Sequence, residues 1–178
     1  DFNKAIELGL NNIGIYSNRG TTYNHLEQYE AAIADFNKAI ELDPKHTAIY
    51  NNRGNAYSGL KQYETAISDF NKAIELDPNN AEAYNNRGNA YSSLKQYETA
   101  ISDYNKAIRF KPNHANIYDN RGLGFNHLEQ YEAAISDFNK AIELTPNNAS
   151  TYNNRGGAYN GLEQYKTAIA DFNQAIEL

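Results

Sequence analysis

The sequence has no cysteine, no methionine and no tryptophan, and only four prolines among its 178 residues. Without cysteine, the chain cannot form a disulfide framework, a thiolate metal site or a cysteine nucleophile. This composition is consistent with a reducing compartment, and together with the missing N-terminal signal peptide it leads us to expect a cytoplasmic location. Because methionine is missing even at position 1, we expect the chain to be a processed or excised piece of a longer protein.

Long hydrophobic runs and excess positive charge are also missing. No apolar stretch approaches the roughly 18 to 20 residues that a membrane-spanning helix needs, so we expect no membrane partner. The formal net charge is −6, whereas binding to a phosphate backbone requires a concentrated basic surface. The composition therefore disfavours nucleic acid as a partner.

What the sequence does contain is a single period of 34 residues that runs through the whole chain. The segment DFNKAIEL begins at Asp1, and it returns at this step, unchanged or as DYNKAIRF or DFNQAIEL, at Asp35, Asp69, Asp103, Asp137 and Asp171. The prolines follow the same step, at Pro44, Pro78, Pro112 and Pro146. Because proline ends a helix and starts a link, each one marks a boundary between two periods.

Within each period, apolar and small residues recur at intervals of three and four, which indicates two amphipathic helices. In the period 47–80, the two helices are expected at roughly 48–60 and 63–76. The alternation that a strand would need is not found. One helix pair cannot bury both of its faces, so we expect the periods to stack on one another.

The repeated residues resemble the tetratricopeptide repeat family. Its pattern is W-x2-L-G-x2-Y, then A-x3-F, then P. In the period 47–80 the matching positions hold Tyr50, Arg53, Gly54, Tyr57, Ala66, Phe70 and Pro78. Two of these depart from the pattern, since tyrosine replaces the tryptophan and arginine replaces the leucine.

The resemblance covers the whole chain and implies an all-α fold, a right-handed superhelical solenoid of stacked antiparallel helix pairs. A single array over 1–178 is expected. Its repeats are 13–46, 47–80, 81–114, 115–148 and 149–178, and residues 1–12 form a partial repeat. Positions in a repeat are counted below from its first residue.

Arginine stands at position 7 of every repeat, at the edge of the packed face of the first helix. A partly buried guanidinium is costly unless it is paired, and an aspartate at position 23 lies near the inner edge of the second helix. We therefore predict structural ion pairs, within a repeat or between neighbours, that join Arg19, Arg53, Arg87, Arg121 and Arg155 to Asp35, Asp69, Asp103, Asp137 and Asp171. The alternative is that some arginines bind acidic groups of a ligand.

Asparagine stands at position 6 of every repeat, pointing away from the packed face. It is a mediocre helix former, but its carboxamide suits the N–H and C=O groups of an extended peptide. The family resemblance implies that first helices line a concave groove for peptides or partner proteins. This row is similar to the asparagine ladder in the superhelical repeats of O-linked N-acetylglucosamine transferases.

The predicted groove residues are Asn18, Asn52, Asn86, Asn120 and Asn154 at position 6, Asn51, Asn85, Asp119 and Asn153 at position 5, and Asn55 and Asn89 at position 9. Position 12 adds Asn24, Ser58, Ser92, Asn126 and Asn160. The alternative is that duplication copied these residues as solvated filler. The family's carboxylate clamp for chaperone C-termini needs basic residues at positions 2 and 5, which are absent here, so chaperone-tail binding is not expected.

The residues indicate no catalytic constellation, metal site or cofactor, because the histidines lack metal-ligand spacing on one helix and no acid pair stands outside the repeat pattern. The predicted function is a non-catalytic scaffold that binds an extended, fairly neutral peptide or a partner protein. One alternative is head-to-tail self-association into a rod, because helix 163–178 presents Ile169 and Ile176 with no following helix. Another is that the chain is the recognition arm of a larger enzyme.

Overall fold

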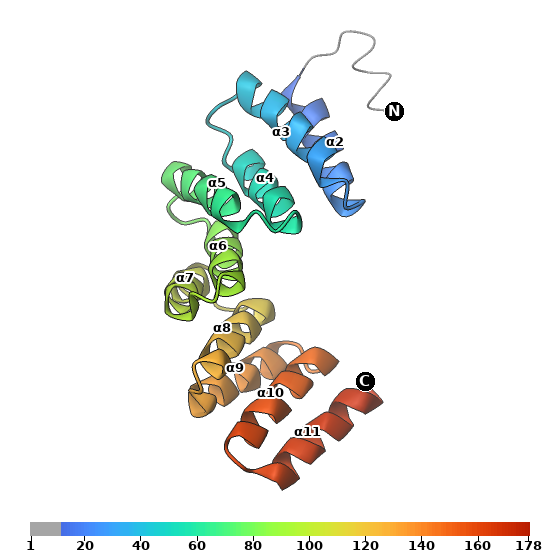
Figure 1. Ribbon diagram of the computed structural model, residues 1–178, viewed down its shortest axis with the longest axis vertical. Helices are drawn as coiled ribbons and strands as arrows, with labels where there is room; N and C mark the ends of the chain where they lie inside the picture. Colours follow the sequence, from blue (N-terminus) through green and yellow to red (C-terminus); the bar gives the residue numbers. More distant parts are fainter. Residues whose placement is uncertain (1–11) are drawn as a thin grey trace. The chain divides into compact units, whose positions relative to one another are not determined.

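A computed structural model describes residues 12–178, and these residues form ten helices and no strand (Figure 1). The helices are α2 (Ile13–His25), α3 (Tyr29–Leu42), α4 (Thr47–Gly59), α5 (Tyr63–Leu76), α6 (Ala81–Ser93), α7 (Tyr97–Phe110), α8 (Ala115–His127), α9 (Tyr131–Leu144), α10 (Ala149–Gly161) and α11 (Tyr165–Glu177). The all-α prediction is confirmed, with two helices in each repeat. Most of the predicted partial repeat, residues 1–11, lies outside the described part of the chain.

The chain divides into two compact units, residues 1–90 and 91–178. The first contains α2 to α5 and most of α6, and the second contains the end of α6 and α7 to α11. Within each unit, helices that follow one another pack together, as α2, α3, α4 and α5 do. First helices also contact first helices, α2 with α4 and α8 with α10. Each unit is therefore a stack of helix pairs, and one array through both units stays a prediction.

The two helices of each repeat are joined by a tight turn that contains one residue in the left-handed region. These residues are Glu27, Lys61, Lys95, Glu129 and Glu163, with φ between 57° and 59°. In the second repeat, the Gln62 backbone N–H closes the turn by donating to the carbonyl of Tyr57 at 2.9 Å. A non-glycine residue in this region costs about 1 kcal/mol, which the packing of the two helices must offset.

In four of the repeats, the core is a phenyl ring placed against a glycine. Phe70 on α5 is fully buried, with Ala66 and Ala73 on either side. A Cβ on Gly54 of α4 would lie 2.6 Å from Cε1 of this ring, which is closer than real side chains come. Gly20, Gly122 and Gly156 face Phe36, Phe138 and Phe172 in the same way. Position 8 is thus glycine because the ring of the second helix occupies the space of a side chain.

Two adjacent glycines of α10 test this packing. Replacing Gly156 with alanine should lower the free energy of unfolding by about 1 to 3 kcal/mol, because the new Cβ would lie 2.7 Å from the Phe172 ring. Replacing Gly157 should raise it by up to about 1 kcal/mol, because no atom lies within 4 Å and alanine is the better helix former. Urea denaturation measures both changes, and changes of the same sign would contradict the packing described here.

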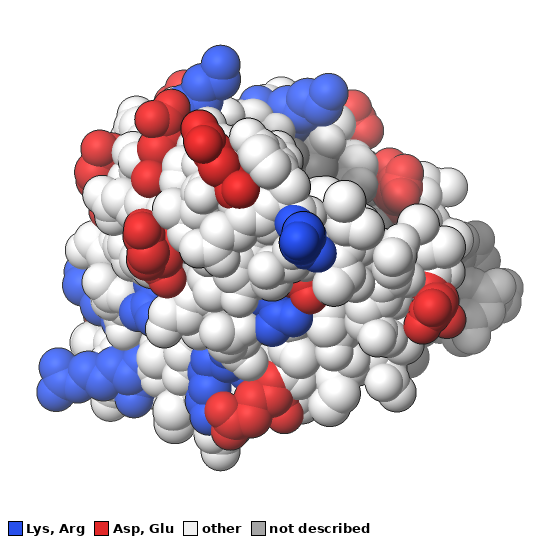
Figure 2. All heavy atoms as spheres, turned by 90° about the horizontal axis from the view of Figure 1, so that it is seen from below, with Lys and Arg blue, Asp and Glu red and all other residues white. Residues whose placement is uncertain are grey.

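Charged side chains are interspersed on the outside. On the face in Figure 2, lysines and arginines lie among aspartates and glutamates. Three exposed pairs run along second helices with separations of 2.6 to 2.8 Å, namely Lys38 with Glu41, Lys72 with Glu75 and Lys140 with Glu143. Among residues 12–178, no helix combines the length and the apolar character needed to cross a membrane.

Candidate functional site

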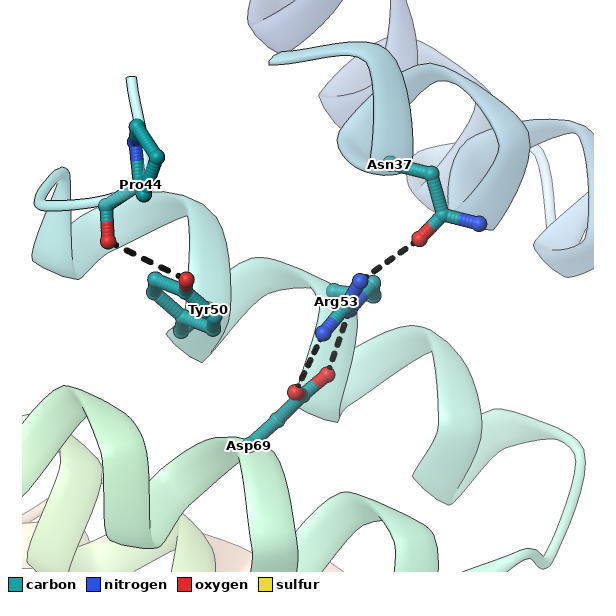
Figure 3. A network of polar contacts seen from close by, with 5 residues as sticks. All are labelled: Asn37, Pro44, Tyr50, Arg53 and Asp69. Atoms are coloured by element: carbon teal, nitrogen blue, oxygen red, sulfur yellow. Dashed lines mark hydrogen bonds and ion pairs between the residues drawn. The ribbon is translucent and has the colours of Figure 1, made fainter. Parts of the chain in front are cut away.

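The arginine at position 7 joins three helices. Arg53 on α4 donates from Nε and Nη2 to the two carboxylate oxygens of Asp69 on α5, both at 2.7 Å (Figure 3). Its Nη1 donates to Oδ1 of Asn37 on α3, in the preceding repeat, at 2.6 Å. Asp69 is buried, and the hydrogen bonds to it raise the pKa of Arg53. The guanidinium is therefore held charged by a two-pronged contact of the strong kind.

The same arrangement recurs along both units. Arg19 with Asp35, Arg121 with Asp137 and Arg155 with Asp171 make two hydrogen bonds each, at 2.6 to 2.7 Å. Arg121 and Arg155 also reach Asn105 and Asn139 of the preceding repeat at 2.6 Å. In the third repeat, Arg87 donates to Asn71 Oδ1 at 2.5 Å. Asp103, the predicted partner of Arg87, belongs to the other unit, where it lies 3.8 Å from Lys106 Nζ. These contacts favour a structural role for the arginines over the alternative of gripping a ligand.

The tyrosine that replaces the family's tryptophan has its own hydrogen-bond partner. The Tyr50 hydroxyl donates to the carbonyl of Pro44 at 3.1 Å, across the link from the preceding repeat (Figure 3). Tyr118 donates to the carbonyl of Pro112 in the same way at 3.0 Å. The ring thus packs in the core, while its hydroxyl satisfies a carbonyl of the link.

Asn51 differs from the prediction that it faces a ligand. It is only 3% exposed. Its Nδ2 donates to Oε1 of Glu82, and its Oδ1 accepts from Nδ2 of Asn86, both at 3.1 Å. Stacking of the repeats turns position 5 of α4 toward α6, and a buried amide needs partners for both of its ends. Asn51 is therefore a junction residue between the second and third repeats.

The junction between the fourth and fifth repeats has its carboxylate at position 5 and not at position 2. Here position 5 is Asp119, which accepts from Nδ2 of Asn154 at 3.3 and 3.4 Å and from the hydroxyl of Thr151. Burial raises the pKa of Asp119, and these two hydrogen bonds offset part of the rise. Position 2, which holds Glu82 in the other junction, is Ser150 here. Each of these two junctions thus contains one carboxylate, at position 2 or at position 5.

Replacing Asp119 with asparagine should stabilise the protein at neutral pH by about 1 kcal/mol or less. Because the folded-state pKa is raised, the folded protein binds more protons than the unfolded chain between the ordinary and the raised value. The carboxyl group therefore lowers stability as pH rises through this window, and the advantage of the variant should grow from pH 4 to pH 7. Urea denaturation at both values measures it. Asn153→Asp, at an exposed position 5, is the control, and an advantage of Asp119→Asn that shrinks with pH would contradict the assignment.

A cavity of about 360 Å³ lies on the first helices of the first unit. It is lined by Thr21, Asn24 and His25 of α2, Tyr29 of α3, Asn52 and Asn55 of α4, and Glu82 of α6. Asn52 and Asn55 are predicted groove residues, and both are half-buried. The prediction did not include Thr21, His25 and Glu82, because their positions vary between repeats. It also did not include Tyr29, because position 17 is tyrosine in every repeat and helix periodicity assigns it to packing.

The other predicted groove residues lie along the same helices. Asn18, Asn89 and Asn153 are exposed, and Asn85, Asn86, Asn120 and Asn154 are half-buried. Asn86 and Asn154 each donate from Nδ2 to position 5 of the preceding repeat, and Asn52 donates weakly to Thr21 Oγ1 at 3.4 Å. The donor end of these position-6 side chains thus points back along the stack. Whether the row binds a ligand stays a prediction.

Comparison with known proteins places these features in a family. Residues 13–46, 47–80, 81–114 and 149–178 match a family model described as tetratricopeptide repeat, and residues 125–162 match a second model described as TPR repeat. The first four ranges coincide with repeats predicted from the sequence. No curated protein matches the chain.

Several solved structures are similar over most of the chain. A crystal structure of MamA protein has 26% sequence identity and a TM-score of 0.80, with 93% of this chain and 90% of that chain covered. A structure titled MamA 41-end, from Desulfovibrio magneticus RS-1, has 24% identity and a TM-score of 0.84, with 93% and 94% covered. YrrB, titled a TPR protein with an unusual peptide-binding site, has 26% identity and a TM-score of 0.75, with 99% and 91% covered. These likenesses support a helical solenoid.

Proposed function

Since the chain belongs to the tetratricopeptide repeat family, we propose that it is a non-catalytic protein-interaction scaffold whose first helices bind an extended peptide or partner segment. The observation that carries the proposal is the cavity lined by Asn52 and Asn55, on the helix face where the repeated asparagines stand. YrrB, a structural neighbour, has a peptide-binding site by its title.

The division of polar groups between two faces supports this assignment. The charged groups of Arg53 and Asp69 are satisfied by each other and by Asn37, so little bonding capacity is left at that edge. Asn55, in contrast, stands half-buried in the cavity wall with a carboxamide that can both donate and accept. Groups of this kind match the N–H and C=O groups of an extended backbone, which favours a ligand read mainly through its main chain.

Selection of peptides from a displayed random library, followed by measurement of their affinity, tests the proposal. The variant Asn52→Ala/Asn55→Ala should bind the selected peptides at least about tenfold more weakly, which corresponds to 1.4 kcal/mol. Its helicity should be unchanged, because Asn52 makes only a 3.4 Å side-chain bond. Asn86 is less suitable for this test, since its loss would strip a partner from buried Asn51.

The matched control replaces Asn79 and Asn113, which are exposed residues of the links between repeats. Their replacement with alanine should leave the affinity unchanged. If both double variants bind the selected peptides as the wild type does, or if the library gives no binder, the first helices are not a peptide-binding surface.

The last helix pair supports a second candidate function, head-to-tail self-association. Ile169 and Ile176 on α11 are 58% and 82% exposed, whereas Ile33 and Ile40, their equivalents on α3, pack against the core of the first repeats. Beside Ile176 lies a cavity of about 520 Å³ that also includes Phe172 and Asn153. A first helix of a second copy could cover this face as α4 covers α3, and such a contact can repeat without closing.

Light scattering over a hundredfold range of concentration tests the self-association. The mean mass should rise with concentration, and Ile169→Lys/Ile176→Lys should abolish the rise. A constant monomer mass for the wild-type chain would remove this candidate and leave the peptide-binding proposal untouched.

A further inference from the structure

Three amides in or next to the cavity of the first unit direct a side-chain N–H to the protein itself. Asn24 Nδ2 donates to the backbone carbonyl of Asn52 at 3.0 Å, and Asn52 Nδ2 donates to Thr21 Oγ1 at 3.4 Å. The Nδ2 of Asn51, the buried neighbour of Asn52 in the chain, donates to Oε1 of Glu82. One N–H of each of these three amides is therefore directed to the protein itself.

The acceptors of the same wall have spare capacity. Asn24 Oδ1 is buried and accepts no hydrogen bond from the residues that the structure describes. Its orientation is fixed, because the amide nitrogen must face the Asn52 carbonyl. A buried acceptor without a partner costs about 1 to 3 kcal/mol, which a ligand donor regains only if the side chains covering the oxygen move to admit it. Glu82, in the first turn of α6, is exposed and adds a carboxylate, whereas no lysine or arginine is among the seven lining residues.

From this arrangement we infer that the cavity binds the basic side chain, lysine or arginine, of the ligand peptide, an inference that rests on the proposed function. An ammonium or guanidinium group brings several donors and no acceptor, which is the complement of a wall with spare acceptors. Glu82 supplies the opposite charge, and charge-assisted hydrogen bonds are stronger than neutral ones. A basic side chain is therefore favoured there over a neutral or acidic one.

An asparagine at position 12 and a carboxylate at position 2 of the next repeat but one occur together only at this cavity, among the five repeats of the sequence. Position 2 is Gly14, Ala48, Glu82, Asn116 and Ser150 in the five repeats, so a carboxylate occurs there once. Position 12 is serine in the second and third repeats and asparagine in the others. Asn24 of the first repeat and Glu82 of the third line one cavity because α2, α4 and α6 contribute to the same wall. We expect one basic residue of the ligand to be anchored here, which fixes the register of the peptide in the groove.

The test uses two small probes, Nα-acetyl-lysine methylamide and Nα-acetyl-norleucine methylamide, which share a four-carbon stem and differ by the ammonium group. Binding is followed by the side-chain amide resonances of Asn24 and Asn52 in ¹H–¹⁵N spectra. The lysine probe should bind at least about tenfold more tightly than the norleucine probe, and this preference should fall with added salt.

Three variants test which side chains cause the preference for the lysine probe. Glu82→Gln should remove most of it and keep the fold, because the glutamine carbonyl can still accept from Asn51. Asn24→Ser, which introduces the residue that Ser58 and Ser92 present at position 12, should weaken the lysine probe severalfold. Glu75→Gln, which removes an exposed carboxylate of α5 paired with Lys72, is the control and should change nothing.

Equal binding of the two probes, or a lysine preference that survives in Glu82→Gln, would overturn the inference. If selected peptides still bind and still depend on Asn52 and Asn55, the proposed function stands without it. If neither the probes nor any peptide binds, both are wrong.

Discussion

Replacing Asp69 with asparagine is expected to lower the free energy of unfolding by about 3 kcal/mol. The side chains of Arg53 and Asp69 are only 19% and 8% exposed, and the pair makes two hydrogen bonds of 2.7 Å. The variant keeps the shape of the side chain but leaves a guanidinium with little access to water opposite a neutral amide. Urea denaturation followed by circular dichroism measures the loss.

The control for Asp69→Asn is Glu75→Gln, on the same helix α5. The side chains of Lys72 and Glu75 are 39% and 66% exposed. Removal of this pair should therefore lower the free energy of unfolding by about 0.5 kcal/mol or less. Arg53→Leu, which restores the family's leucine, should recover much of the loss when it is combined with Asp69→Asn, because no unpaired charge remains. Equal effects of Asp69→Asn and Glu75→Gln would show that the buried pair is not structural.

Replacing Asn51 with aspartate is expected to cost about 2 to 4 kcal/mol at pH 7. The carboxylate that replaces Nδ2 would face Oε1 of Glu82, which now accepts at 3.1 Å from the amide. Two like charges close together, one of them on a residue that is 3% exposed, raise the pKa of the new carboxyl group. The loss should therefore shrink as the pH falls, because a protonated aspartic acid can donate to Glu82 as the amide does.

A second substitution should rescue the Asn51→Asp variant. Glu82→Ser gives position 2 the residue found at the junction between the fourth and fifth repeats, Ser150, where position 5 is the carboxylate Asp119. In the double variant only one carboxylate remains at the junction, so most of the lost stability should return, and the two effects should be strongly non-additive. If the losses of the two single variants simply add in the double variant, the side chains at positions 2 and 5 do not interact, and the account of this junction is wrong.

The period of the sequence was sufficient to predict much of the fold. Spacings of three and four located both helices of each repeat, since the register of an amphipathic helix is set by which side chains must be buried. The pairing of Arg53 with Asp69 followed from the cost of a buried charge without a partner. Both inferences depend on one repeat alone, and stacking does not alter them.

The features that sequence reasoning missed depend on how one repeat is rotated against the next. Helix periodicity shows that Asn51 lies off the core face of α4, but not that α6 covers it. The bond from Arg53 to Asn37 and the cavity shared by α2, α4 and α6 have the same origin. The turn residues in the left-handed region could not be recognised from the sequence, because they are glutamate or lysine and not glycine.

The most direct test of the groove is a ¹H–¹⁵N spectrum of the asparagine side-chain amides, recorded with and without a library-selected peptide. If the first helices form the binding surface, the resonances of Asn52 and Asn55 should shift on saturation, while those of Asn37 and Asn71, which are held by Arg53 and Arg87, should stay in place. Shifts confined to Asn37 and Asn71, with Asn52 and Asn55 unmoved, would place the ligand elsewhere and contradict the proposed binding surface.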